Sequence, residues 1–112
     1  MSLKDTKMIT GLRGEVYRTL GQFWDSQKNF ATAFIWWIRA AHQYSRVKDE
    51  DMTRIALGNT KESVEKIQFA TQLDYKLIGE YQRLFAEIDD KIYKIEKDLL
   101  DKAIKDALNK KI

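Results

Sequence analysis

No proline occurs among the 112 residues of this chain, and this absence restricts the possible folds more than any other feature. Proline marks loops in most globular proteins and breaks a helix when it falls inside one. Hydrophobic residues recur at steps of three and four, the spacing of one helical face, and no segment shows the alternation of a strand. We therefore predict an all-α protein, a three- or four-helix bundle that forms a single domain over residues 1–112.

The composition argues against catalysis and against a metal centre. The chain lacks cysteine, which removes disulfides, thiolate zinc sites, iron–sulfur clusters and cysteine nucleophiles. His42 is the only histidine, so no second imidazole is present to share a metal. The segment "TGLRGE" has too few glycines for a phosphate-binding loop. We expect that the protein is not an enzyme and that it has no catalytic residues, no cofactor and no metal ligands.

The hydrophobic segments are too short for a membrane-spanning helix. No apolar run approaches the ~18 residues that such a span requires, and the start of the sequence lacks the apolar segment of a signal peptide. With 44% hydrophobic and 33% charged residues, the composition is typical of a folded, soluble protein. We predict a cytoplasmic protein that does not bind membranes.

The first half of the sequence predicts an antiparallel pair of helices. Residues 6–27 carry apolar side chains at helical spacing, namely Ile9, Leu12, Val16, Leu20, Phe23 and Trp24. Polar residues interrupt this pattern from Ser26 to Asn29, and Asn29 is a suitable N-cap for a second helix. Because the connection is short, we expect the two helices to pack against each other.

The second helix is apolar around most of its circumference, with five apolar residues in a row at 34–38. At about 100° per residue, Trp37 lies on the broad apolar face, Ile38 on its flank, and Ile35 almost opposite. One explanation is that neighbouring helices of the same chain pack on several sides. The other is that Ile35 and Ile38, beside Arg39 and His42, form a partner-binding patch. In both cases Trp37 is expected to belong to the core.

A third helical element begins near residue 49. Asp49, Glu50 and Asp51 place negative charge where a helix N-terminus favours it. The sequence at 57–60, "LGNT", could break this element, because Asn59 followed by Glu62 fits a capping box. Gly58 could equally lie inside one continuous helix, so the choice between three and four helices stays open. Asp74 offers a second restart.

From Tyr75 the chain reads as one long helix to the C-terminus, with an apolar seam that alternates steps of three and four. The seam consists of Ile78, Tyr81, Phe85, Ile88, Ile92, Ile95 and Leu99. Such a helix would be roughly 50 Å long, too long for the first two helices to cover. We therefore predict a homodimer in which the seam self-associates; the alternative is that the helix folds back over a looser bundle. Residues 1–5 and 109–112 are expected to fray.

The hairpin resembles a tetratricopeptide repeat over about residues 14–45. The residues that carry the resemblance are Tyr17, Leu20, Gly21, Trp24, Ala33, Trp37 and Ala40. The resemblance implies that small residues let the two helices approach closely while aromatic side chains fill the groove, and that the protein binds another protein or peptide. The proline that usually ends such a repeat is missing.

The segment "DSQKNFATAFIWWIRAA" is also similar to the central part of MIT domains, three-helix modules that resemble one such repeat with an added helix. The similarity rests on Asp25, Asn29, Phe30, Ala33, Trp37 and Ala40. It implies docking of a short helical tail of a partner protein between the helices. Fold alone does not establish function, so this remains an expectation.

Charge suggests an alternative function. Residues 1–48 hold eight Lys or Arg against three acids, a balance of +5, whereas the remaining residues balance at −2. A basic N-terminal half could bind nucleic-acid phosphates, although the basic residues form no dense row. We therefore predict a non-catalytic interaction module that docks a helical peptide or self-associates, with nucleic-acid binding as the alternative.

Overall fold

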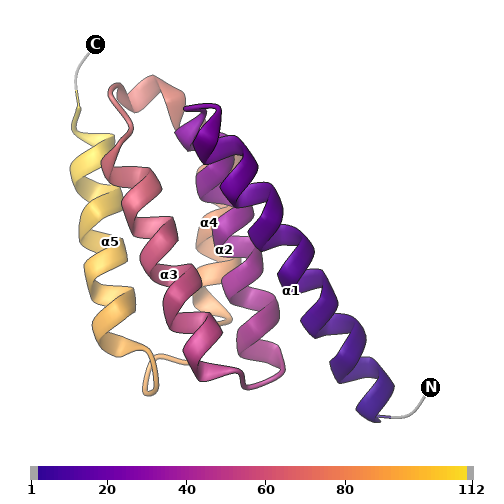
Figure 1. Cartoon of the computed structure of the whole chain (residues 1–112). Coiled ribbons are helices and arrows are strands. Elements are labelled where there is room, and N and C mark those ends of the chain that lie inside the picture. The colour runs from indigo at the N-terminus through magenta and orange to yellow at the C-terminus, as the bar shows by residue number, and fades with distance from the viewer. Residues whose placement is uncertain (1–2, 111–112) are drawn as a thin grey trace.

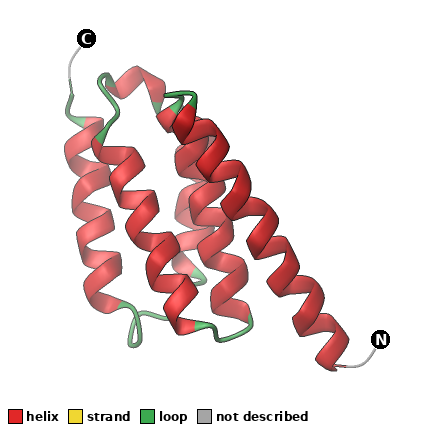
Figure 2. Cartoon of the chain, in the orientation of Figure 1, coloured by secondary structure: helices red, strands yellow, loops and turns green. Residues whose placement is uncertain are grey.

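The computed structural model describes residues 3–110, and the side chains of residues 6–110. All regular structure in this part of the chain is helical, which confirms the predicted all-α class (Figures 1 and 2). The described residues form five α-helices, however, and not the three or four that we predicted. The elements in chain order are α1 (Leu3–Ser26), α2 (Phe30–Arg46), α3 (Glu50–Glu65), the short 3₁₀ helix η1 (Ala70–Gln72), α4 (Tyr75–Ala86) and α5 (Lys94–Leu108).

Helix α2 lies at the centre of the bundle. It packs against α1, α3 and α4, and α5 packs against α3. Successive α-helices run in opposite directions, so α3 and α5 lie side by side in the same direction (Figure 1). Helix α1 is the edge helix on one side of the bundle and packs mainly on α2. This arrangement explains why α2 is apolar nearly all the way round.

Three acidic or amide side chains start the helices, as the sequence indicated. The carboxylate or amide oxygens of Asn29, Asp49 and Asp74 accept hydrogen bonds from backbone N–H groups three residues ahead, at 2.9 to 3.2 Å. Helix α3 continues through residues 57–60, where Gly58 is exposed and Thr60 is fully buried. The open question at Gly58 is thus answered: the chain leaves the helix only after Glu65.

The predicted single helix from Tyr75 to the C-terminus is wrong. The chain doubles back at residues 87–93, where Asp89 Oδ1 accepts hydrogen bonds from the N–H groups of Lys91 and Ile92. The buried Lys97 amine holds this turn, since it donates to the Ile88 carbonyl at 2.7 Å. Ile88 itself lies in the core. It keeps the apolar spacing across the turn, and for this reason the sequence pattern looks like that of one continuous helix.

Helices α1 and α2 approach closely at two glycines. A Cβ atom on Gly21 would lie 2.7 Å from the Trp37 ring, and one on Gly14 would lie 2.8 Å from the Tyr44 ring. The Tyr44 hydroxyl donates to Glu15 Oε1 at 2.5 Å across the same interface. Burial and this carboxylate raise the pKa of Tyr44 to about 12, which keeps the hydroxyl protonated as a donor at neutral pH.

The two ends were predicted to fray over residues 1–5 and 109–112. Residues 1–2 and 111–112 lie outside the described part of the chain. Helix α1 already begins at Leu3, and Lys110 Nζ donates to the carbonyl oxygens of Glu65 and Ile67 at 3.1 and 2.5 Å. The described end of α5 is therefore attached to the end of α3.

Candidate functional site

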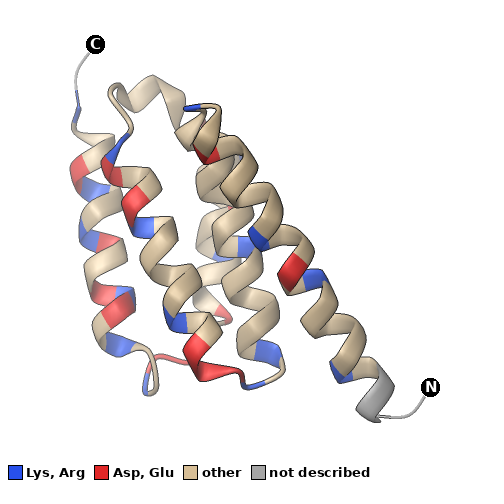
Figure 3. Ribbon diagram, viewed as in Figure 1, with Lys and Arg blue, Asp and Glu red and all other residues tan. Residues whose placement is uncertain are grey.

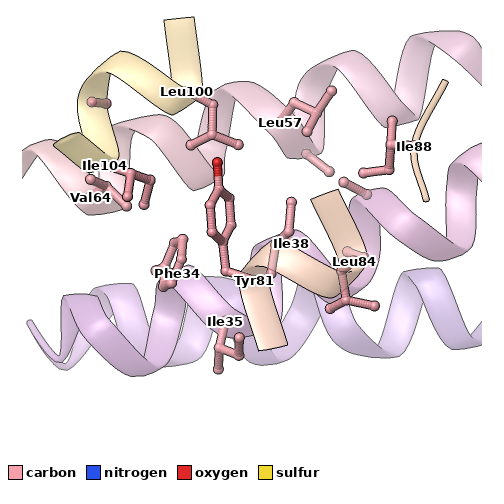
Figure 4. Packing of buried hydrophobic residues seen from close by; sticks show 14 of the residues in the cluster. Phe34, Ile35, Ile38, Leu57, Val64, Tyr81, Leu84, Ile88, Leu100 and Ile104 are labelled. Carbon is pink, nitrogen blue, oxygen red and sulfur yellow. The ribbon is translucent and has the colours of Figure 1, made fainter. Parts of the chain in front are cut away.

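The predicted partner patch on α2 is largely inside the protein. Ile35 is 4% exposed and Ile38 is fully buried, so their expected exposure to a partner is wrong. The physical reason is α4, which packs on this side of α2 and contributes Tyr81 and Leu84 to the same core cluster (Figure 4). Helix α4 follows a long intervening segment, and the sequence gives no signal for where it docks. Neighbouring helices of the same chain thus account for the apolar surplus of α2.

Arg39 and His42, the polar members of that predicted patch, fasten α4 to α2. The Arg39 guanidinium donates from Nε and Nη2 to both carboxylate oxygens of Glu80, at 2.8 to 3.2 Å. His42 Nε2 lies 2.6 Å from Glu87 Oε2, at the C-terminal end of α4. Both residues therefore make contacts within the chain rather than presenting free polar groups to a partner.

A polar pocket of about 210 Å³ lies between these two contacts. It is lined by Tyr17, Arg39, His42, Gln43, Glu80, Arg83 and Leu84. Arg39, His42 and Arg83 each have a carboxylate oxygen within 3.8 Å, from Glu80 for Arg39 and from Glu87 for the other two. Among residues 6–110, no group of three or more His, Asp or Glu side chains is placed to hold a metal ion. The arrangement joins helices and offers no nucleophile beside a base.

Burial controls the protonation of His42. Its side chain is 12% exposed, and this loss of hydration lowers the pKa of His42 below its ordinary value. The hydrogen bond and the charge of Glu87 oppose the shift, whereas the positive charges of Arg46 and Arg83 add to it. The neutral imidazole is thus the form that the folded protein prefers.

We expect acid to destabilise the fold through His42. Because the folded protein holds this proton less tightly than the unfolded chain, the free energy of unfolding should fall as the pH drops through the ordinary histidine value of about 6.5. Urea unfolding of the wild type and His42→Gln between pH 5 and 8 measures this contribution. The substitution should flatten the pH dependence in this range, and equal slopes for the two proteins would contradict the assignment.

The seven residues predicted to self-associate do not share one face. Tyr81 and Ile88 are buried in the core, and Ile78 and Phe85 pack against it. Three residues remain exposed at the start of α5 and just before it: Ile92, Ile95 and Leu99, at 43%, 72% and 49%. The break between α4 and α5 therefore removes the continuous seam, and only its last part is accessible.

The structure reveals an apolar surface that the sequence analysis missed. Met8, Leu12, Val16 and Phe23 are 50–59% exposed on α1, and we call them the outer stripe. At 3.6 residues per turn, the other three lie within about 40° of Leu12 around the helix axis. A shallow hollow of about 290 Å³ lies along this side of α1, lined by Glu15, Val16, Thr19 and Leu20. Helix α1 thus carries apolar side chains on two opposite faces.

A signal in the sequence could have separated these two faces. Gly14 and Gly21 are seven residues apart and contact the aromatic rings of α2, so they mark the inner face of α1. Leu12 and Val16 lie roughly opposite on the helix. The sequence prediction grouped them with Trp24 on one helical face, because it counted residues at steps of three and four without regard to the glycines.

Basic and acidic positions are interspersed along the helices (Figure 3). Within the basic N-terminal half, Arg18 pairs with Glu15 and Arg39 pairs with Glu80.

Comparisons with models of protein families, with curated proteins and with solved structures found no match to this chain. No helix in the described residues is long and apolar enough to cross a membrane.

Proposed function

We propose that the protein is a non-catalytic interaction module that docks an amphipathic helix on the outer stripe of α1. The observation that carries this proposal is that α1 is apolar on two opposite faces, of which only one is used by the fold. An edge helix of a bundle normally exposes a polar face to solvent. Apolar residues in line on that face are the kind of surface that binds a partner helix.

The free energy of covering the outer stripe is consistent with docking of a partner helix. Fully burying an aliphatic or aromatic side chain contributes about 1.5–3 kcal/mol, so covering the exposed half of each stripe residue contributes on the order of 1 kcal/mol. Four such residues, together with the partner side chains that cover them, offset the entropy lost on association and leave a modest affinity. The tetratricopeptide and MIT resemblances of the hairpin support the same class of function, although in this chain the outer stripe is not one of the resembling positions.

Ile92, Ile95 and Leu99 form a second, smaller apolar surface beside α5. It is what remains accessible of the predicted self-association seam, and it lies at the opposite edge of the bundle from α1 (Figure 1). Ile95 is the most exposed of the three, so a substitution at Ile95 tests whether a partner binds at this edge.

Leu12→Glu should abolish partner binding and leave the fold intact. Leu12 is 59% exposed, and surface substitutions of this kind usually change stability by no more than about 0.5 kcal/mol. Ile55→Glu on α3 is the matched control, because Ile55 is 51% exposed but lies outside the stripe. Thermal unfolding of the three proteins measures their stability. The amount of protein, a second copy included, that each of them retains in a pull-down from the host cells measures binding. Unfolding of Leu12→Glu, or equal association by both variants, would contradict the proposal.

The nucleic-acid alternative is tested with the same proteins. Binding through phosphate contacts weakens steeply with salt. Leu12→Glu adds only one negative charge to the protein surface, so its effect on such binding should be small. An apolar helix–helix contact depends much less on salt. Titration of DNA and RNA at several salt concentrations therefore separates the two functions.

A further inference from the structure

We propose that the helix docked on the outer stripe is α1 of a second copy of this chain, in antiparallel orientation about a two-fold axis near Val16. This inference rests on the proposed function and names the partner at the same surface. A two-fold contact uses the same patch on both chains, so the patch must fit itself when it is reversed.

The shape of the outer stripe meets this requirement. Its large side chains lie towards the two ends, with Met8 and Leu12 on one side of the centre and Phe23 on the other. The hollow lies between them, beside Val16 and Thr19. Reversing a second copy about Val16 brings its Leu12 to this hollow, as a knob enters a hole, and brings Met8 towards Phe23. A parallel pairing would instead place the hollows opposite each other.

The charges near the centre also suit a reversed copy. Between Met8 and Phe23 the midline of the stripe carries no charged residue. On one flank of the stripe, Glu15 and Arg18 form an ion pair at 2.7 Å and are 47% and 30% exposed. In the antiparallel arrangement this flank meets the same flank of the other copy in reverse order. Each Arg18 then lies towards the opposite Glu15, so the two flanks attract rather than repel.

The size of the contact sets the expected affinity. Helix α1 has 24 residues and is about 36 Å long, so two such helices bury an interface at the low end, below about 1,200 Å². We expect a dissociation constant in the micromolar range, which corresponds to about −8 kcal/mol. The protein should therefore exchange between monomer and dimer at concentrations that are accessible to sedimentation equilibrium.

Single cysteines provide the test, because the natural chain contains none. Val16→Cys, Met8→Cys and Phe23→Cys are treated with a short bis-maleimide, alone and in pairwise mixtures. Val16→Cys should cross-link with itself, and Met8→Cys should cross-link with Phe23→Cys but not with itself. Ile55→Cys on α3 and Ile95→Cys on α5 are the controls and should stay monomeric. Added Leu12→Glu substitution should cause loss of the Val16→Cys product.

Each other result overturns the inference. Self-cross-linking of Met8→Cys would show a parallel pair, and cross-linking through Ile95→Cys would place the contact at α5. A 13.2 kDa species at all concentrations up to about 100 μM, well above a micromolar dissociation constant, would exclude a second copy as the partner. In that last case the proposed function still stands or falls with the binding of another protein to the stripe, which Leu12→Glu tests separately.

Discussion

Replacing Trp37 by alanine is expected to lower the free energy of unfolding by about 3–5 kcal/mol. The Trp37 ring is 5% exposed and lies against Gly21, at the closest approach of α1 and α2. Its removal leaves a cavity that the two helices cannot close, because their separation is also set by Tyr44 against Gly14. Since domains are stable by only about 5–15 kcal/mol, this loss should be visible as a large shift of the urea midpoint.

Trp36 supplies the control for this experiment. It is the adjacent residue of the same type but is only partly buried, with the Arg39 guanidinium 4.5 Å from its ring centre. Trp36→Ala should therefore cost less than Trp37→Ala in the same urea titration. If Trp37→Ala lost less than about 1 kcal/mol, or no more than Trp36→Ala, the described packing of the hairpin would be wrong.

Ile38→Glu is expected to have the largest effect, with a loss above about 4 kcal/mol that unfolds much of the protein at neutral pH. Ile38 is fully buried where α4 covers α2, and a carboxylate at this position would lose its hydration inside an apolar cluster. Ile95→Glu, at a position 72% exposed, is the matched control and should keep its melting temperature. Circular dichroism melts compare the two variants. A folded Ile38→Glu protein would show that Ile38 is not buried in the core.

The local parts of the fold were predictable because each depends on residues close together in the chain. Asn29 and Asp74 were recognised as helix starts from one side chain and its position. Trp37 was assigned to the core from the spacing of its neighbours on one helix. The all-α class followed from the missing proline and from apolar periodicity, and neither requires knowledge of how distant segments pack.

The errors all concern contacts between distant segments. Ile35 and Ile38 were read as surplus apolar surface because nothing near them in the sequence shows that α4 docks there. The long C-terminal helix was inferred because Ile88, in the turn after α4, keeps the spacing of the residues before it. The turn is stabilised by Asp89 and by the buried Lys97, whose sequence context is also compatible with an exposed helix surface.

The candidate site was missed for a related reason. Periodicity counts apolar residues but does not state which of two opposite faces meets a neighbour, so Leu12 and Val16 were grouped with Trp24 on one helical face. Only the contacts of Gly14 and Gly21 with aromatic rings of α2 show that the opposite face is the inner one. Arg39 and His42 were predicted to contact a partner, but in the structure they contact Glu80 and Glu87, whose positions far along the sequence give no sign of this.

The claim that the outer stripe of α1 is occupied by a protein partner is tested most directly by photo-crosslinking inside the cells that produce this protein. Benzoylphenylalanine is placed at position 12 or, as the control, at position 55, both of which are about half exposed in the folded chain. We predict cross-linked adducts at position 12 and none at position 55, whether the partner is a second copy or another protein. Equal adducts at both positions, or none at position 12, would contradict the proposed function.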